Sequence, residues 1–147
     1  NPYTPAVNLV FALEEALKMM REEGLENIFL RHNKHKLAMS NAAKALNLKL
    51  FANEKYLSPS ITAIKTKEMD AEEFRKTIKN KFDILLAGGQ DHLKGKIFRV
   101  GHLGYVNNRD IITVVSAISN TLLGLGKITP KQAGDALLVT SKYLEEN

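Results

Sequence analysis

The sequence predicts an α/β fold: a small, largely antiparallel sheet covered by helices, with a long N-terminal helix and two C-terminal helices. Apolar residues recur at helical spacing near both ends of the chain. Between them lie short segments that alternate with the two-residue period of strands. With 147 residues, 44% of them hydrophobic, the chain is long enough to form one domain with its own core.

The first third of the chain predicts two successive helices. Thr4 is a good N-cap residue, and Pro5 suits the first helical position, where its missing N–H would have no partner anyway. Gly24 is a typical C-terminal stop, and a second helix is expected over residues 25–46. The apolar positions of the first helix are Val10, Leu13, Leu17 and Met20. The expected buried positions of the second are Ile28, Leu37, Ala38, Ala42 and Leu46.

The middle of the chain predicts short strands. Residues 49–52 are a short candidate, and residues 60–67 are a stronger one because β-branched residues alternate there. Residues 83–87 are expected to form a buried strand that ends at a pair of glycines. Residues 96–101 are its expected partner across the intervening connection.

Three further helices follow from their start signals. Asp70 followed by Glu73 predicts the first, and Asn108 is the expected cap of the second. A threonine–proline pair at 129–130 repeats the cap signature for a last helix that ends near Glu145. The residues expected to face the core are Phe74 and Ile78 in the first of these helices and Ile111, Val115, Ile118 and Leu122 in the second.

Composition excludes several classes of protein. The sequence has no cysteine, so neither a disulfide framework nor a thiolate metal site can form. No apolar run approaches the roughly 18 residues of a membrane span. The formal charge of +5 comes from basic residues interleaved with acidic ones, which favours a solvated surface on a cytoplasmic protein over a nucleic-acid site. The start at Asn1 instead of Met suggests a fragment or a processed product.

Enzyme motifs are incomplete in this sequence. Gly89 and the Gly95–Lys96 pair are spaced one residue too far apart for a phosphate loop. His32 and His35 stand at helical spacing that could hold a metal, but their polar surroundings favour a solvated helix face. No serine, histidine and acid constellation stands out. The chain by itself does not resemble a complete enzyme, and no catalytic residue is assigned to it.

Two residues remain as candidates for binding. Thr4, at the start of a helix, is either a simple N-cap or a hydroxyl that also contacts an anion such as phosphate. Arg99 lies in an otherwise apolar strand, on the opposite face from Phe98 and Val100. Its guanidinium requires a carboxylate or phosphate partner, which is either one of the chain's own acids or a ligand.

An ordered set of segments resembles the class V aminotransferases, which depend on pyridoxal phosphate (PLP), and in particular the alanine–glyoxylate and serine–glyoxylate group. The segment G-K-I-F-R-V-G-H-L-G at 95–104 is similar to one near the C-terminus of that group. The segment Y-T-P-A-V-N at 3–8 resembles the stretch that follows the large domain. Between them, G-L-E-N at 24–27, the Arg31–His32 pair and F-D-I-L-L-A-G-G at 82–89 keep the family's order and spacing.

The resemblance implies roles for both candidate residues. Arg99 would bind the α-carboxylate of the substrate, and Thr4 would reach the cofactor phosphate of the other subunit of a homodimer. The family has a tyrosine three residues before that threonine, where this chain has Asn1. The lysine that carries the cofactor would lie in a large PLP-binding domain outside this chain.

The resemblance also implies an organisation and a reaction. Residues 1–24 would be the leading helix, residues 25–126 the α/β small domain, and residues 127–147 the C-terminal helix of a single domain. The parent enzyme would transfer an amino group from a small amino acid, similar to alanine or serine, to a 2-oxo acid such as glyoxylate or pyruvate. No nucleic acid and no membrane are expected as partners. The alternative is a stand-alone binding module, for instance for RNA, although its strands offer only Phe51 and Phe98 for base stacking.

Overall fold

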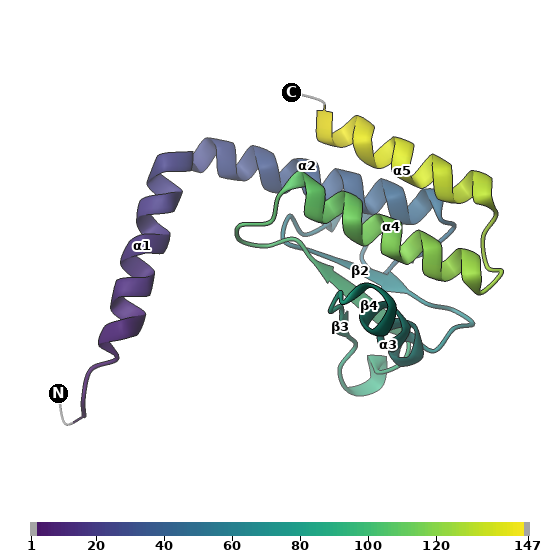
Figure 1. Cartoon of the computed structure of the whole chain (residues 1–147), viewed down its shortest axis with the longest axis horizontal. Helices are drawn as coiled ribbons and strands as arrows, with labels where there is room; N and C mark the ends of the chain where they lie inside the picture. The colour runs from purple at the N-terminus through teal and green to yellow at the C-terminus, as the bar shows by residue number, and fades with distance from the viewer. Residues whose placement is uncertain (1–2, 146–147) are drawn as a thin grey trace. The chain divides into compact units, whose positions relative to one another are not determined.

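The computed structural model describes residues 3–145, and its α/β fold is the one expected (Figure 1). It divides into two compact units, Asn1–Arg31 and His32–Asn147. The second unit holds the sheet and the core, so it is the unit that positions Arg99. None of the helices in the described part of the chain is long and apolar enough to cross a membrane.

Helix α1 (Val7–Glu23) of the first unit begins later than predicted. Its N-cap is Ala6, with no side-chain cap, so the prediction that Thr4 caps this helix is wrong. Ala6 has φ −76° and ψ 65°, and the N–H of Val7 donates to the carbonyl of Pro5 (2.8 Å), which is an inverse γ-turn. This turn separates the Thr4–Pro5 pair from the helix.

The expected apolar stripe of α1 is present, but nothing in its own unit covers it. No residue of α1 is buried; Val10 is 61% exposed and Leu13 57%. Gly24 ends the helix as predicted, and its N–H donates to the carbonyl of Met20 (3.0 Å). An amphipathic helix gains most of its stability by burying its apolar face, and within its own unit α1 buries none of it.

Helix α2 (Leu25–Ala45) confirms the second predicted helix. Its second half enters the core of the second unit, where Ala38, Ala42 and the following Leu46 are buried as expected. Ile28 and Leu37 are only partly buried. The N–H of Leu48 then donates to the carbonyl of Ala43 (2.9 Å) and closes the helix end.

The sheet has four strands in the order β1-β2-β4-β3, and every pair is antiparallel. The strands are β1 (Lys49–Leu50), β2 (Ile61–Lys65), β3 (Ala87–Gly88) and β4 (Ile97–Gly101). Short 3₁₀ turns lie at η1 (Glu54–Tyr56) and η2 (Asp91–Leu93). The central pair β2–β4 is the longest, and β1 and β3 are two-residue edges.

The predicted strand at residues 83–87 is wrong for most of its length. Asp83 adopts the left-handed conformation (φ 55°) that ends the preceding helix, and only Ala87 and Gly88 pair with β4. The carbonyl of Leu86 accepts a hydrogen bond from the side chain of Arg75 (2.7 Å) instead of a strand partner. The predicted pairing with residues 96–101 is confirmed for Ala87, the one residue of the predicted strand that lies in β3.

The first of the helices that follow packs against strands β3 and β4. Helix α3 (Ala71–Phe82) begins at Asp70 as predicted, because the Asp70 carboxylate accepts from the N–H groups of Glu72 and Glu73. Phe74 and Ile78 are buried, and the Phe74 ring lies 5.1 Å from that of Phe98.

The last two helices contact each other side by side (Figure 1). Helix α4 (Asn108–Gly124) is capped by Asn107 and not by Asn108 as predicted, since the reciprocal partner, Asp110, stands three residues after Asn107. All four positions of its predicted stripe are buried: Ile111, Val115, Ile118 and Leu122. Helix α5 (Pro130–Glu145) begins after Thr129 as predicted, where Gln132 accepts from the N–H of Thr129 (2.9 Å).

Candidate functional site

Arg99 lies at the centre of β4, on the face of the sheet opposite the core. Its cross-strand neighbours are Ala63 on β2 and Ala87 on β3. The adjacent Phe98 and Val100 are buried on the other face, at 0% and 2% exposure, whereas Arg99 is only partly buried. The alternation expected from the sequence therefore places the guanidinium away from the core.

The guanidinium of Arg99 is held by the backbone and not by an acid. Its Nε–H donates to the carbonyl oxygen of Gly88 at 2.9 Å. Within residues 3–145, each ion pair joins a carboxylate to a cation other than Arg99. A guanidinium with one neutral partner keeps its terminal donors for an anion.

Thr4 is exposed and lies before the γ-turn at the start of α1. No hydrogen bond of its hydroxyl is present within the described residues, so the group is not used as a cap. Asn1, which stands where the resembling family has a tyrosine, lies outside the described residues. Thr4 belongs to the first unit and Arg99 to the second, so each is a separate feature.

The histidines at helical spacing do not form the solvated face expected from the sequence. His35 is fully buried, and its Nε2 lies 3.1 Å from Oδ1 of Asn108 at the start of α4; His32 is partly buried. Among the described residues, no group of three potential ligands could hold a metal ion. The expectation of a solvated face is wrong for His35 because the second half of α2 enters the core.

Sequence reasoning missed a buried polar pair, His102 and Thr62, on the face of the sheet opposite Arg99. His102 is fully buried, its Nδ1 lies 3.0 Å from the carbonyl oxygen of Pro59, and its Nε2 lies 2.9 Å from Oγ1 of Thr62. A carbonyl only accepts, so Nδ1 carries the proton and the Thr62 hydroxyl donates to Nε2. Burial lowers the pKa of His102 to about 4, and the charges of His35 and His32 add to that effect. The one sequence signal for this buried position of His102 is that it directly follows the predicted strand that forms β4.

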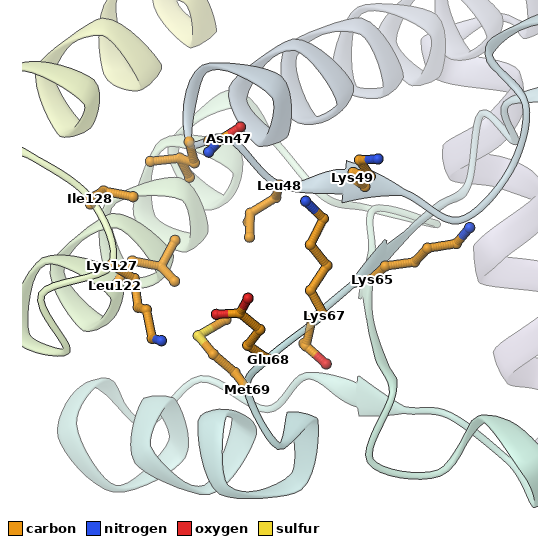
Figure 2. Close-up of a pocket in the computed structure, with 12 residues that line it drawn as sticks. Asn47, Leu48, Lys49, Lys65, Lys67, Glu68, Met69, Leu122, Lys127 and Ile128 are labelled. Atoms are coloured by element: carbon orange, nitrogen blue, oxygen red, sulfur yellow. The ribbon is translucent and has the colours of Figure 1, made fainter.

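A hollow of about 220 Å³ lies away from Arg99, between the ends of α2 and α4. Lys49, Lys65, Lys67 and Lys127 line it together with Glu68. Figure 2 shows that Lys49 and Lys65 extend away from the hollow, while Lys127 lies on its far side. The four ammonium groups therefore do not converge on one anion site.

Comparison with known proteins places this fold in a family. The chain is 54% identical over 125 residues to the "soluble hydrogenase 42 kDa subunit" of Anabaena cylindrica, covering 85% of this chain and 33% of that protein. It is 35% identical over 149 residues to the serine–glyoxylate aminotransferase of Methylorubrum extorquens, covering 99% of this chain and 36% of that protein. The chain thus spans about a third of the length of the curated relatives that it matches.

A solved structure agrees with the sequence matches. The ureidoglycine–glyoxylate aminotransferase of Bacillus subtilis superposes with a TM-score of 0.86 at 30% identity, covering 95% of this chain and 37% of that one. No model of a protein family matches the chain. The resemblance first seen in the segments around Tyr3 and Arg99 is nonetheless confirmed along nearly the whole sequence. The chain therefore belongs to the class V aminotransferases, of whose length it spans about a third.

Proposed function

We propose that the chain is the substrate-orienting domain of a PLP-dependent aminotransferase that acts on a small amino acid and a 2-oxo acid. The observation that carries this proposal is Arg99, a guanidinium on the open face of the sheet with only a backbone partner among the described residues. The relatives support the substrate class, because the curated names include serine and ureidoglycine as donors and glyoxylate as the acceptor. The proposed amino donor is therefore similar to alanine or serine, and the proposed acceptor is similar to glyoxylate or pyruvate.

The contribution of this chain to the reaction would be binding and orientation. Arg99 would hold the carboxylate of either substrate by two parallel hydrogen bonds, which fix both its position and its rotation. PLP, when bound, supplies the electron sink for deprotonation at Cα. The lysine that carries it would belong to the large domain, outside this chain. Orientation matters because the Cα–H bond reacts only when it is aligned.

The uncovered apolar surface of α1 supports a docking role toward that large domain. Several large apolar residues of the first unit are more than half exposed: Leu9, Val10, Phe11, Leu13, Leu25, Phe29 and Leu30. Exposed apolar surface of this extent marks an interface. The relatives are about three times as long as the match, so the rest of the parent polypeptide is the proposed occupant. Residues 1–24 would then serve as the leading helix, 25–126 as the small domain and 127–147 as its last helix.

Thr4 is proposed to contact the cofactor phosphate of the other subunit of a cytoplasmic homodimer. Its hydroxyl is exposed and is not used as a helix cap, which fits a group offered to a ligand. Because one hydrogen bond to a charged group contributes about 1.5–3 kcal/mol, Thr4→Ala should weaken cofactor affinity more than tenfold in the intact enzyme. Thr4→Ser keeps the hydroxyl and should be nearly silent. A cofactor titration in which both variants match the wild type would refute the contact.

The decisive experiment is Arg99→Lys in the intact enzyme. Lysine keeps the charge but loses the planar fork, so KM should rise for both amino acids and 2-oxo acids and kcat should fall. We expect a loss of roughly 2–5 kcal/mol in kcat/KM. The spectrum of the bound cofactor should not change, because the cofactor does not depend on this residue.

The control for Arg99→Lys is an amine substrate without a carboxylate. Its turnover should change little, since Arg99 has nothing to grip on it. Equal damage to the amine and the amino acid would show that Arg99 supports the fold, and the proposed carboxylate role would be wrong.

Two other functions receive less support. The relative from Anabaena cylindrica is named as a hydrogenase subunit, but this chain has no cysteine and so offers no thiolate ligand for an iron–sulfur cluster. The RNA-binding alternative loses one of its two stacking residues, because Phe98 is fully buried against Phe74.

A further inference from the structure

We infer that the ion pair between Glu72 and Arg75 on α3 positions Arg99, acting through the backbone of β3. The inference rests on the proposed carboxylate-binding role of Arg99. Neither Glu72 nor Arg75 is expected to touch the substrate, so both are positioning residues.

The first link in this arrangement joins α3 to the segment that forms β3. The Nε–H of Arg75 donates to the carbonyl of Leu86 at 2.7 Å, and its Nη1 donates to Oε2 of Glu72 at 2.7 Å. The two side chains are 23% and 39% exposed, so solvent screens the pair only in part. The other carboxylate oxygen of Glu72 is buried and has no hydrogen-bond partner among the described residues.

The second link is the close approach of Gly88 to this ion pair. A Cβ atom at Gly88 would lie 2.5 Å from Nη1 of Arg75 and 2.6 Å from Oε1 of Glu72. A side chain at this position would have to push the ends of these two side chains aside, so Gly88 packs directly on the ion pair. The buried Glu72 oxygen is therefore the one that Gly88 covers.

The third link joins Gly88 to Arg99. The carbonyl of Gly88 accepts the Nε–H of Arg99 at 2.9 Å. Strand β3 is a two-residue edge with β4 as its one strand neighbour, so the sheet alone fixes it weakly. The ion pair supplies the missing support from the α3 side.

This arrangement specifies how Arg99 would grip a carboxylate. With Nε–H committed to Gly88, the two terminal nitrogens are the pair available for parallel hydrogen bonds. The grip would thus be end-on, and its direction would depend on where the Gly88 carbonyl lies. A shift of β3 would rotate the guanidinium and misalign the substrate without removing any group that touches it.

The experiment compares Arg75→Lys with Lys76→Gln, a control at an exposed position on the same helix. Lysine has no counterpart of the Arg75 Nε–H, so it cannot hold the Leu86 carbonyl and the Glu72 carboxylate in the same geometry. In the 147-residue chain, the Arg99 Nε–H signal in ¹⁵N NMR should shift, and its exchange with water should accelerate at least fivefold. In the intact enzyme, kcat/KM for amino acids should fall about tenfold, mainly through KM, while an amine without a carboxylate stays within twofold.

Two further variants keep the inference testable if Arg75→Lys does not fold. Glu72→Gln keeps the shape of the side chain and should give a smaller change of the same kind. Gly88→Ala should push the side chains of Glu72 and Arg75 away from β3 and so reproduce the Arg99 signal of Arg75→Lys. Folded variants with an unchanged Arg99 Nε–H signal, or with equal loss for amine and amino acid, would overturn the inference.

The outcome for Arg99→Lys separates this inference from the proposed function. If that substitution affects the amine and the amino acid alike, the carboxylate role fails and positioning for substrate fails with it. If it discriminates between them but Arg75→Lys does not, the carboxylate role stands and only the positioning role is wrong.

Discussion

The two faces of the four-stranded sheet differ in what covers them, although the same strands supply both. On one face, Ile64, Phe98 and Val100 are buried against the helices. On the other, Arg99 is partly buried and Lys65 is exposed. Because successive strand residues point to opposite faces, β4 contributes to the core and presents a potential ligand group within three consecutive residues.

Polar groups are treated differently on the two faces. On the covered face, Thr62 and His102 satisfy each other in a buried pair. On the open face, Arg99 has a backbone partner and no acid within the described residues. A polar group in the core needs a hydrogen-bond partner in the folded chain, whereas one on an open face can stay solvated until a ligand binds. The contrast predicts large changes in stability from substitutions on the first face and small ones from substitutions on the second, where Arg99 should instead affect binding.

The largest expected effect is on the covered face. Phe98→Ala removes a fully buried ring that contacts Phe74, and it should lower the free energy of unfolding by about 3–5 kcal/mol. Chemical denaturation of the 147-residue chain measures this loss. The comparison between the two faces would be contradicted if Arg99→Gln, one residue away, lowered the free energy of unfolding by as much.

A pH-dependent loss of stability should follow from His102. Its pKa is about 4 in the folded chain and 6.5 in the unfolded reference, so below pH 6.5 the unfolded chain binds a proton that the folded chain does not. The free energy of unfolding should therefore decrease as the pH falls from 6.5 toward 4, by up to about 3 kcal/mol from this group.

The measurement is denaturation at pH 7 and pH 4.5 for three chains. His102→Gln should be less stable at pH 7 but should lose less between the two pH values than the wild type. His92→Gln, at an exposed position, should keep the wild-type pH dependence. Parallel profiles for wild type and His102→Gln would show that another group is responsible.

The smallest expected effect has the opposite sign and lies on the open face. Lys49 and Lys65 stand directly opposite each other in the β1–β2 register, and like charges in this position are destabilising. Lys49→Glu should raise the free energy of unfolding by about 0.2–1 kcal/mol and preserve the contact of Lys65 with the Phe51 ring. Lys49→Gln should give part of this gain, and a loss of stability in Lys49→Glu would contradict the account.

Local sequence determined the elements and the face on which Arg99 lies. Helical periodicity predicted the stripe of α4, and caps such as Asp70 and Thr129 placed helix starts to the residue. Strand alternation placed Arg99 on the face of its strand opposite to that of Phe98, before any partner strand was known. These signals are local because they depend on side chains within one or two turns of each other.

Only the tertiary structure decided which residues are buried together and what they contact. His35 was expected in solvent but is buried against Asn108, which lies 73 residues away along the chain. Of the strand expected at residues 83–87 only Ala87 lies in β3, because Arg75 takes the carbonyl of Leu86. Thr4 does not cap α1 as expected, because a backbone γ-turn lies between it and the helix. In the first two cases the deciding partner lies elsewhere in the chain, where neither periodicity nor capping patterns can point to it, since both describe neighbours in sequence and not neighbours in space.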